Sequence, residues 1–331
     1  MRLSPWPRRG DVLARALVIA LSLCAASCSR RDDRPYVPKP GTAYDADTGL
    51  PVEIISSKDN AEMVLVKAGR FKKGDPNGLA PTTRVQAFYI DKYEVTNERY
   101  HRFTSATLHR TPAFVSDEGA LFRWRDKHYE QGREKYPVVL VSFDDATAFA
   151  TWAGKRLPSQ TQWEYAARGT DGREFPWGNS RLPVGDCNTA DRLAGETLVS
   201  REAWQTWYDQ WIQQPPSTRN LRALQPVGLF PKDVSPAGCF DLGGNVREWC
   251  VLKGRNGSVN GVNSESIMGE ELPSNGHVAC GGSWLQDASA TRAWRYGTGS
   301  SAQRFDVGFR CVVSAADPAI QALIQPADPS D

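Results

Sequence analysis

The irregularity of the sequence after residue 168 limits the folds open to this chain more than any other feature. Short apolar pieces there are separated by long stretches rich in Gly, Asn, Pro and Ser. Glycine and proline interrupt regular elements, so the 28 Gly and 22 Pro of the chain predict many turns and long loops rather than a helical bundle. The 11 Trp, 10 Tyr and 12 Phe residues still supply ample bulk for a core. We therefore expect short elements packed around aromatic side chains.

The first half of the chain carries clearer signals for short strands and helices. Residues 63–66 and 88–90 are apolar runs of strand length. Three helices are predicted by a capping hydroxyl that precedes apolar residues at helical spacing, and they begin after Thr96, Ser142 and Ser159. The third signal is the strongest, because Ser159 and Gln162 form a capping box in which each side chain satisfies a backbone donor of the other.

Two inserts interrupt the second half. Residues 192–224 contain four aromatic residues spaced for one face of a helix: Trp204, Trp207, Tyr208 and Trp211. We expect this face to pack onto the domain, and a partner-binding surface is the alternative. Residues 253–276 are rich in Gly, Asn, Ser and Glu with almost no apolar content, so an exposed, mobile loop is expected there.

The first 27 residues are typical of an export signal. An arginine-bearing start precedes an apolar run at 16–23, which is too short to span a bilayer as a mature helix. The following Ala-Ala-Ser-Cys at 25–28 resembles the lipobox of bacterial lipoproteins, with Ala25 where leucine is usual. We therefore expect a lipid on Cys28 that anchors the chain to a membrane of the cell envelope, facing the periplasm or the exterior. An ordinary secretory signal is the alternative.

The charge of the chain argues against a polyanionic partner. The formal net charge is +2, and the first 27 residues contribute +3 of it (four Arg against one Asp), so the remainder is near −1. No basic stripe with interleaved aromatic residues is present. We expect no nucleic-acid partner.

Export changes the meaning of the cysteines. In an oxidising compartment, disulfides are expected among the five that follow Cys28: Cys187, Cys239, Cys250, Cys280 and Cys311. The number is odd, so at least one should stay free or pair with another chain. Cys280 is expected to be a disulfide partner, with Cys250 as one candidate, but the connectivity is open. No Cys-x-x-Cys spacing exists and the four histidines are scattered, which argues against a structural zinc site.

Seven short motifs follow one another between residues 63 and 313. They are Phe-Tyr-Ile-Asp-Lys-Tyr-Glu-Val-Thr-Asn at 88–97, Tyr-Pro-Val at 136–138 leading to Val-Ser-Phe at 141–143, Lys-Arg-Leu-Pro-Ser at 155–159 with Trp-Glu-Tyr-Ala-Ala-Arg-Gly at 163–169, Pro-Trp-Gly-Asn at 176–179, Asp-Leu-Gly-Gly-Asn-Val-Arg-Glu-Trp at 241–249, Gly-Gly-Ser-Trp at 281–284 and Gly-Phe-Arg-Cys at 308–311. Together they resemble the formylglycine-generating-enzyme (sulfatase-modifying-factor) family.

The resemblance implies an α+β fold related to C-type lectins, with little regular secondary structure. With the signals above, it divides the chain into a lipoprotein signal peptide (1–27), a tether (28–60), a sulfatase-modifying-factor-like domain (61–314) and a flexible tail (315–331). The motif tryptophans Trp163, Trp177, Trp249 and Trp284 are expected to be core residues rather than active-site residues.

The resemblance also implies a structural calcium ion in the loop at 241–248. Its ligands would be the side chains of Asp241 and Glu248 and the carbonyl oxygens of Gly244 and Val246, hard oxygens of the kind that calcium prefers. The alternative is a surface turn in which Glu248 forms a salt bridge. A second calcium site of the family would begin at Asn188 and Thr189, but its later aspartate has no match beyond the 192–224 insert.

The oxidase chemistry of the family does not carry over. The resemblance implies two cysteines that hold copper(I), a soft cation best bound by thiolates. Their positions are Gln286 and Thr291 here, and the histidine between them is Asp287. We therefore expect no copper and no catalytic residue at these positions.

We expect instead a non-oxidase member that binds a ligand, an envelope protein or a glycan. The segment between the last two motifs displays ligand-contacting residues in related surface lipoproteins, and here it holds Arg292, Trp294, Arg295, Tyr296 and Arg304, residue types typical of binding hot spots. The alternative for these side chains is packing and pairing inside the fold. Two enzymatic alternatives stay open: another metal-dependent oxidase of the family, although the histidine cluster for iron is missing, or a true sulfatase-modifying oxidoreductase with an unrecognised cysteine pair.

Overall fold

The computed structural model describes residues 33–75, 81–113, 122, 124–215, 218–219, 222–252, 276–297 and 304–324. The expected signal peptide, Cys28 and nearly all of the predicted loop at 253–276 lie outside these residues. Within the described ranges, no helix has the length and apolar character needed to cross a membrane.

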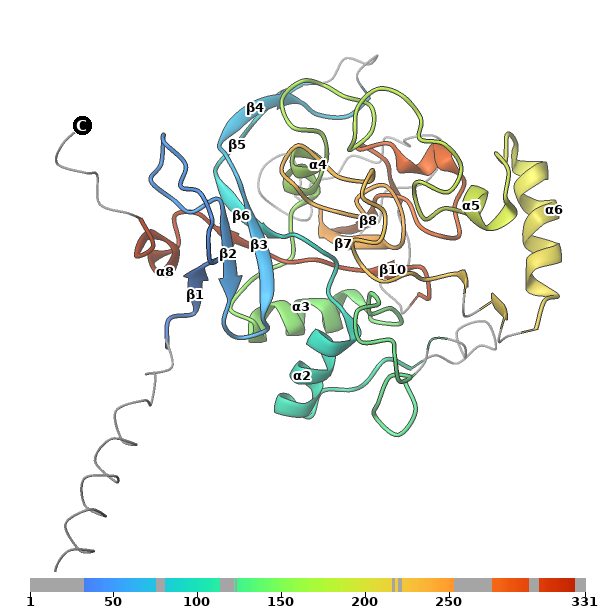
Figure 1. The fold of residues 1–331 in the computed structure, drawn as a ribbon, viewed down its shortest axis with the longest axis horizontal. Coiled ribbons are helices and arrows are strands. Elements are labelled where there is room, and N and C mark those ends of the chain that lie inside the picture. Colours follow the sequence, from blue (N-terminus) through green and yellow to red (C-terminus); the bar gives the residue numbers. More distant parts are fainter. Residues whose placement is uncertain are drawn as a thin grey trace, which may run out of the picture. The chain divides into compact units, whose positions relative to one another are not determined.

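A five-stranded sheet forms one side of the domain (Figure 1), with all its strands paired antiparallel. Its centre is β3 (Ala61–Val66) beside β6 (Phe88–Asp91), the two strands predicted from their apolar runs. Both are nearly all buried, since the sheet is covered on both faces. The last strand, β11 (Val312–Ser314), pairs with β6 and so joins the end of the domain to its beginning.

A second, smaller sheet carries the motif at 241–249. Its order is β10-β7-β8-β9, in which β7 (Arg247–Val251) pairs antiparallel with β8 (His277–Cys280) and parallel with β10 (Val307–Gly308). The edge strand β9 spans Tyr296–Gly297. A separate hairpin of β4 (Gly69–Lys72) and β5 (Thr82–Val85) completes the strands.

The three predicted helices are confirmed, together with their caps. Thr96 caps α2 (Asn97–Thr107), and Ser142 caps α3 (Phe143–Trp152) in a capping box with Asp145. The predicted Ser159–Gln162 capping box begins α4 (Gln160–Arg168). Trp163, Ala166 and Ala167 of α4 are buried against the two sheets, as the apolar face predicted. Trp249 and Trp284 are also fully buried, in agreement with a core role. The core prediction is wrong for Trp177, which is half-buried.

The aromatic insert forms α6 (Arg201–Ile212), capped by Ser200, at the edge of the domain (Figure 1). Trp204 Nε1 donates a hydrogen bond of 2.7 Å to the carbonyl oxygen of Leu285. The ring of Trp211 packs on Trp284 at a centroid distance of 5.1 Å. The predicted packing of this helix onto the domain is confirmed.

Two predicted boundaries differ from the structure. The tether expected over 28–60 is wrong from residue 35 onward, since β1 (Tyr36–Pro38) and β2 (Glu53–Ser56) extend the five-stranded sheet. β1 lies at the sheet edge, where a short strand that contains proline is tolerated and leaves little periodic signal.

The flexible tail expected over 315–331 is wrong for its first ten residues. Asp317 caps α8 (Pro318–Gln321), and Ile320 and Leu323 are buried in the core. An Asp-Pro pair is itself a helix-start signal, which the Ala/Pro/Asp-rich composition concealed.

Candidate functional site

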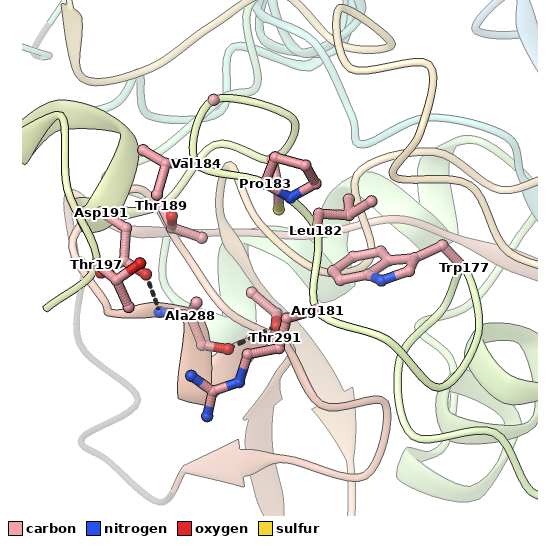
Figure 2. Close-up of a pocket in the computed structure, with 12 residues that line it drawn as sticks. Trp177, Arg181, Leu182, Pro183, Val184, Thr189, Asp191, Thr197, Ala288 and Thr291 are labelled. Atoms are coloured by element: carbon pink, nitrogen blue, oxygen red, sulfur yellow. Dashed lines mark hydrogen bonds between the residues drawn. The ribbon is translucent and has the colours of Figure 1, made fainter. Parts of the chain in front are cut away.

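A pocket of about 90 Å³ lies beside η2 (Ala288–Thr291), in the segment where the family resemblance places the copper-binding cysteines. Its other walls are the loop at 177–189 and the beginning of α5 (Ala190–Ala194) (Figure 2). Apolar lining comes from Trp177, Leu182, Pro183 and Val184, and polar lining from Arg181, Thr189, Asp191, Thr197 and Thr291. The pocket therefore joins an aromatic wall to several hydroxyl groups.

Of the two positions that correspond to the family's cysteines, only Thr291 lines this pocket. Its hydroxyl donates a hydrogen bond of 2.7 Å to the carbonyl oxygen of Ala288, within η2. Gln286 is held by its backbone, with its carbonyl oxygen accepting from Ala190 N at 2.8 Å. Its side-chain Oε1 is buried and has no hydrogen-bond partner. Neither side chain offers a soft ligand.

Asp191 joins two walls of the pocket, and no sequence motif pointed to it. Its carboxylate accepts hydrogen bonds of 2.9 Å from the backbone nitrogens of Leu198 and Ala288, so it joins α5 to η2. Burial raises the pKa of this carboxyl group. Its partners are backbone amides, one of them 97 residues away, and such pairs leave no spacing pattern in a sequence.

Cys187 is the only cysteine among the described residues that lines the pocket. Its Sγ donates to Asp233 Oδ2 at 3.2 Å. Burial and the adjacent Asp233 raise the pKa of this thiol well above its usual value. It therefore stays protonated at neutral pH and is neither a thiolate ligand nor an activated nucleophile.

The glycine pair of the motif at 241–249 allows this loop to approach the pocket wall closely. A Cβ atom on Gly244 would lie 2.6 Å from the carbonyl oxygen of Asn188, so no larger residue fits there. Asn188 is itself occupied: its Nδ2 donates to Asn245 Oδ1 and to the carbonyl oxygen of Ala223, and its Oδ1 accepts from Arg192. Thr189, by contrast, makes no capping bond and faces the pocket.

The four residues expected to bind calcium lie in a buried acidic cluster, not in a surface turn. Both Asp241 and Glu248 are about fully buried, at 1% and 0% exposure. Asp241 Oδ2 accepts from Gly228 N at 2.6 Å, but its Oδ1 is buried with no partner. Glu94 accepts from the backbone nitrogen of Val246 at 3.1 Å and adds a further acid.

Glu248 differs from Asp241 because its oxygens are occupied. Arg310 donates to both carboxylate oxygens, at 2.7 to 2.9 Å, and Trp163 Nε1 donates to Oε2 at 2.7 Å. The unpartnered Asp241 oxygen fits a cation ligand, whereas Glu248 already has an internal counterion. Across the described ranges, no group of three or more His, Cys, Asp or Glu side chains is arranged to hold a metal ion.

Asp241 should leave a signature in the pH dependence of stability. Burial first, and Asp233 second, raise the pKa of its carboxyl group to about 8. In the unfolded chain this carboxyl group releases its proton near pH 4 (roughly the ordinary Asp value). Between that pH and the folded pKa, the folded state therefore binds more protons than the unfolded state. As a result, the free energy of unfolding falls as pH rises through this range. Asp241→Asn cannot ionise and should remove that fall.

The measurement is urea denaturation in the presence of a chelator at several pH values from about 4 to about 8. We expect the stability of Asp241→Asn relative to the unaltered protein to rise across this range. Asp47→Asn is the control, because that side chain is 81% exposed. A difference for Asp241→Asn that stays constant with pH would contradict the prediction.

The expected ligand-contacting residues largely pair within the domain. Arg292 Nε donates to Glu174 at 2.7 Å, and Arg304 Nε donates to Asp306 at 3.0 Å. Trp294 is flanked by the guanidinium groups of Arg168 and Arg292, at 5.3 and 6.0 Å from its ring centroid.

The last two of these residues lie beside the second sheet. Tyr296 is in β9, where burial raises the pKa of its hydroxyl to about 12, and Arg295 accepts a backbone hydrogen bond from Gly281. All five residues are half-buried. The structure therefore brings Arg292 and Trp294 together and places Arg304 in a separate ion pair.

A larger cavity of about 300 Å³ lies between the β2–β3 turn and α2. Most of its charged side chains are already paired with one another or with neighbours: Arg99 with Asp59, Arg102 with Glu98 and Glu62 with Lys39. It therefore offers less unpaired recognition chemistry than the pocket beside η2.

The comparison with known proteins agrees with this architecture. Residues 52–315 match the family described as a sulfatase-modifying factor enzyme 1-like domain. The formylglycine-generating enzyme of Bos taurus is 30% identical over 249 residues, which cover 62% of this chain and 62% of that protein. The chain thus spans less than two thirds of that relative's length.

Two further similarities cover more of the chain. A Bos taurus protein named "Inactive C-alpha-formylglycine-generating enzyme 2" is 26% identical over 310 residues, covering 80% of this chain and 92% of that protein. The structure of PvdO from Pseudomonas aeruginosa superposes with a TM-score of 0.54 at 22% identity, covering 79% of this chain and 97% of PvdO. The latter likeness shows the fold, and the expected α+β fold with little regular structure is confirmed.

Proposed function

This chain belongs to the family of sulfatase-modifying factor enzyme 1-like domains, and from that premise we propose that it is a non-oxidase member that binds a ligand at the pocket beside η2. The observation that carries the proposal is Thr291. This residue lines the pocket at a position where the resemblance requires a copper-binding cysteine, and its hydroxyl is already bonded to Ala288. A hydroxyl and the amide of Gln286 are poor ligands for copper(I).

The remaining cysteines do not supply a substitute at the pocket. Cys187 is held protonated by burial and by the adjacent Asp233, and Cys239, Cys250, Cys280 and Cys311 are buried in the core. The relatives named as inactive support a scaffold that persists without the oxidase chemistry.

The pocket offers a chemistry of recognition in place of catalysis. Trp177 presents a half-buried aromatic wall, and Arg181 is exposed at the rim with no ion pair to any described residue. Thr189 and Thr197 add hydroxyl groups. An aromatic face combined with convergent hydroxyls and a guanidinium suits a polar ligand that carries hydroxyl or carbonyl groups. Within the cell envelope, this description fits a glycan or an exposed segment of a protein.

The test is a binding screen of the purified protein against a glycan array, peptidoglycan fragments and candidate envelope proteins. We expect saturable binding of one class that Trp177→Ala and Arg181→Ala weaken at least tenfold, the loss of about 1.4 kcal/mol expected from a pocket contact. Arg173→Ala, which removes an Arg outside the pocket, is the matched control. Absence of a saturable ligand, or equal loss in the control, would count against the proposal.

The oxidase remains the second candidate, supported by the identity to formylglycine-generating enzymes. Its test is direct: the protein is loaded with copper(I) and incubated with a Cys-x-Pro-x-Arg peptide. We expect no conversion of the cysteine and no copper retained after desalting. Conversion of the peptide cysteine above the level seen with the copper-loaded Cys250→Ser/Cys280→Ser double variant would instead support an oxidase that uses this cysteine pair.

We also propose that Cys28 carries a lipid that holds the domain at a membrane. The folded unit begins at Pro35, and six residues of sequence, 29–34, lie between it and Cys28. A chain of six residues can span at most roughly 20 Å. Fractionation tests this: Cys28→Ala should move the protein from the membrane fraction to the soluble envelope fraction. Retention in the membrane would overturn it.

A calcium ion at Asp241 is a further proposal, supported by the unpartnered Asp241 oxygen and the acids around it. A bound cation would stabilise the ionised carboxylate and raise the melting temperature. Calcium should therefore raise the melting temperature of the unaltered protein and not that of Asp241→Asn. An equal shift in both proteins would contradict calcium binding at this residue.

A further inference from the structure

Two strands of the second sheet bring a pair of cysteines onto one face. In the antiparallel register of β7 and β8, Cys250 lies opposite Val278, and Cys280 lies opposite Glu248. Residues two apart on a strand share a face, and directly opposed residues share it too. Cys250 and Cys280 are therefore diagonal neighbours on the same side of the sheet, in the core cluster that contains Trp163.

Both thiols are buried in that cluster, at 0% and 1% exposure. Burial raises the pKa of the Cys250 thiol, and the neighbouring Cys280 raises it further. The other described cysteines have different surroundings: Cys187 donates to Asp233, and Cys239 interacts with Ser235. Cys311 is buried beside Asp91. Among the described cysteines, Cys250 and Cys280 are the two that the register of paired strands places on one face.

We propose that Cys250 and Cys280 are a cross-linking site, joined by a disulfide when the chain folds in an oxidising compartment. Each thiol loses one proton and one electron, and one S–S bond forms. The electrons reduce a second disulfide, that of a thiol-disulfide oxidant, to two thiols. The odd cysteine count then leaves Cys187, Cys239 and Cys311 as free thiols.

The disulfide would link β7 to β8 and so stabilise the second sheet. It would enclose residues 251–279, which include the long polar segment between β7 and β8. A cross-link across a long connection removes conformational freedom from the unfolded chain, so it stabilises the folded state. It also joins the strand that carries Glu248 to the strand that leads directly into Gly281 and η2. The wall of the pocket would thereby be fixed to the core.

Burial determines when the bond can form. Both thiols are inaccessible to solvent in the folded domain. Burial also raises the pKa of the Cys250 thiol. This slows thiol–disulfide exchange, because the thiolate is the attacking species. The cross-link should therefore form during folding. In the folded protein it should resist reductant until the second sheet opens.

Peptide mapping tests the proposal on the full-length protein exported to a bacterial envelope. Trypsin places each of these five cysteines on a separate peptide, with Cys250 in residues 248–253 and Cys280 in residues 256–292. After alkylation under denaturing conditions without reductant, we expect these two peptides to be recovered as one linked species, 2 Da below the sum of their masses by loss of two hydrogens. Reductant should separate them. Recovery of both peptides alkylated and unlinked would overturn the proposal.

A second measurement does not depend on export. Denatured, reduced protein is refolded in glutathione buffers of increasing oxidised fraction, and the linked peptide is quantified. The linked species should increase with oxidant, and it should melt several degrees above the reduced protein. Cys250→Ala and Cys280→Ala should abolish both effects, whereas Cys239→Ala, a matched change in the same core cluster, should retain them. Linkage of other cysteines in preference to this pair would also refute the assignment. These outcomes are independent of whether the pocket binds a ligand.

Discussion

Replacing Arg310 by methionine should lower the free energy of unfolding by about 3–5 kcal/mol, the usual cost of leaving one partner of a buried ion pair without its counterion. Arg310 and Glu248 are both 0% exposed and share three hydrogen bonds. The same guanidinium donates to the carbonyl oxygens of Asp91, Lys92 and Phe240. It therefore connects β6, β7 and the loop before β7, and methionine replaces none of these bonds.

Equilibrium denaturation measures this loss, with two companion variants. Arg173→Met breaks the more exposed pair with Asp171 and should cost less than about 1 kcal/mol. Glu248→Gln combined with Arg310→Met leaves no buried charge at the pair, so the double variant should be more stable than Arg310→Met alone. A single variant as mild as Arg173→Met would show that water reaches the pair and that the buried arrangement is wrong.

Lys155→Met should cause a loss of similar size, about 3–5 kcal/mol, for the same physical reason in a different place. The Lys155 ammonium lies 3.0 Å from carboxylate oxygens of both Asp59 and Asp91, and all three side chains have 0% exposure. Arg99 is the second cation of this group and bonds to the same two carboxylates. Removing the ammonium leaves two buried carboxylates with one guanidinium.

The pH dependence of this variant identifies the mechanism. Burial pushes the pKa of Asp59 upward, but Arg99 and Lys155 outweigh it and hold the pKa far below its usual value. A lowered folded pKa contributes stability above the unfolded pKa, near pH 4 (roughly the ordinary Asp value), and that contribution is lost as pH falls below it. The deficit of Lys155→Met should therefore be largest at neutral pH and shrink in acid. Lys232→Met, which breaks an exposed pair with Asp186, should show no such trend.

Both ion networks are made by residues of the motifs that carry the family resemblance. Asp91, Lys155, Glu248 and Arg310 come from four different motifs and form two buried groups. Trp163, from the same motif as Lys155, donates to Glu248. These motif side chains hold the fold together, and none of them is Gln286 or Thr291. The proposed non-oxidase role is therefore compatible with an intact fold.

The sequence by itself determined the features that depend on a few neighbouring residues. The caps at Thr96, Ser142 and Ser159 were predictable because each bond closes over three residues. The aromatic spacing of residues 204–211 predicted a helix with one packed face. The motif order predicted the family and the fold. The two boundary errors arose at β1 and α8, because elements of three and four residues are too short to show a periodic pattern of apolar residues.

The tertiary structure alone decided the features that join distant parts of the chain. Asp191 meets Ala288 across 97 residues, and Arg310 meets Glu248 across 62. Cys250 and Cys280 become neighbours only through the register of β7 and β8. No local pattern encodes such pairs, because a side chain's partner depends on which strands lie side by side and in what register. For the same reason, the sequence shows a threonine at position 291 but does not show the pocket that surrounds it.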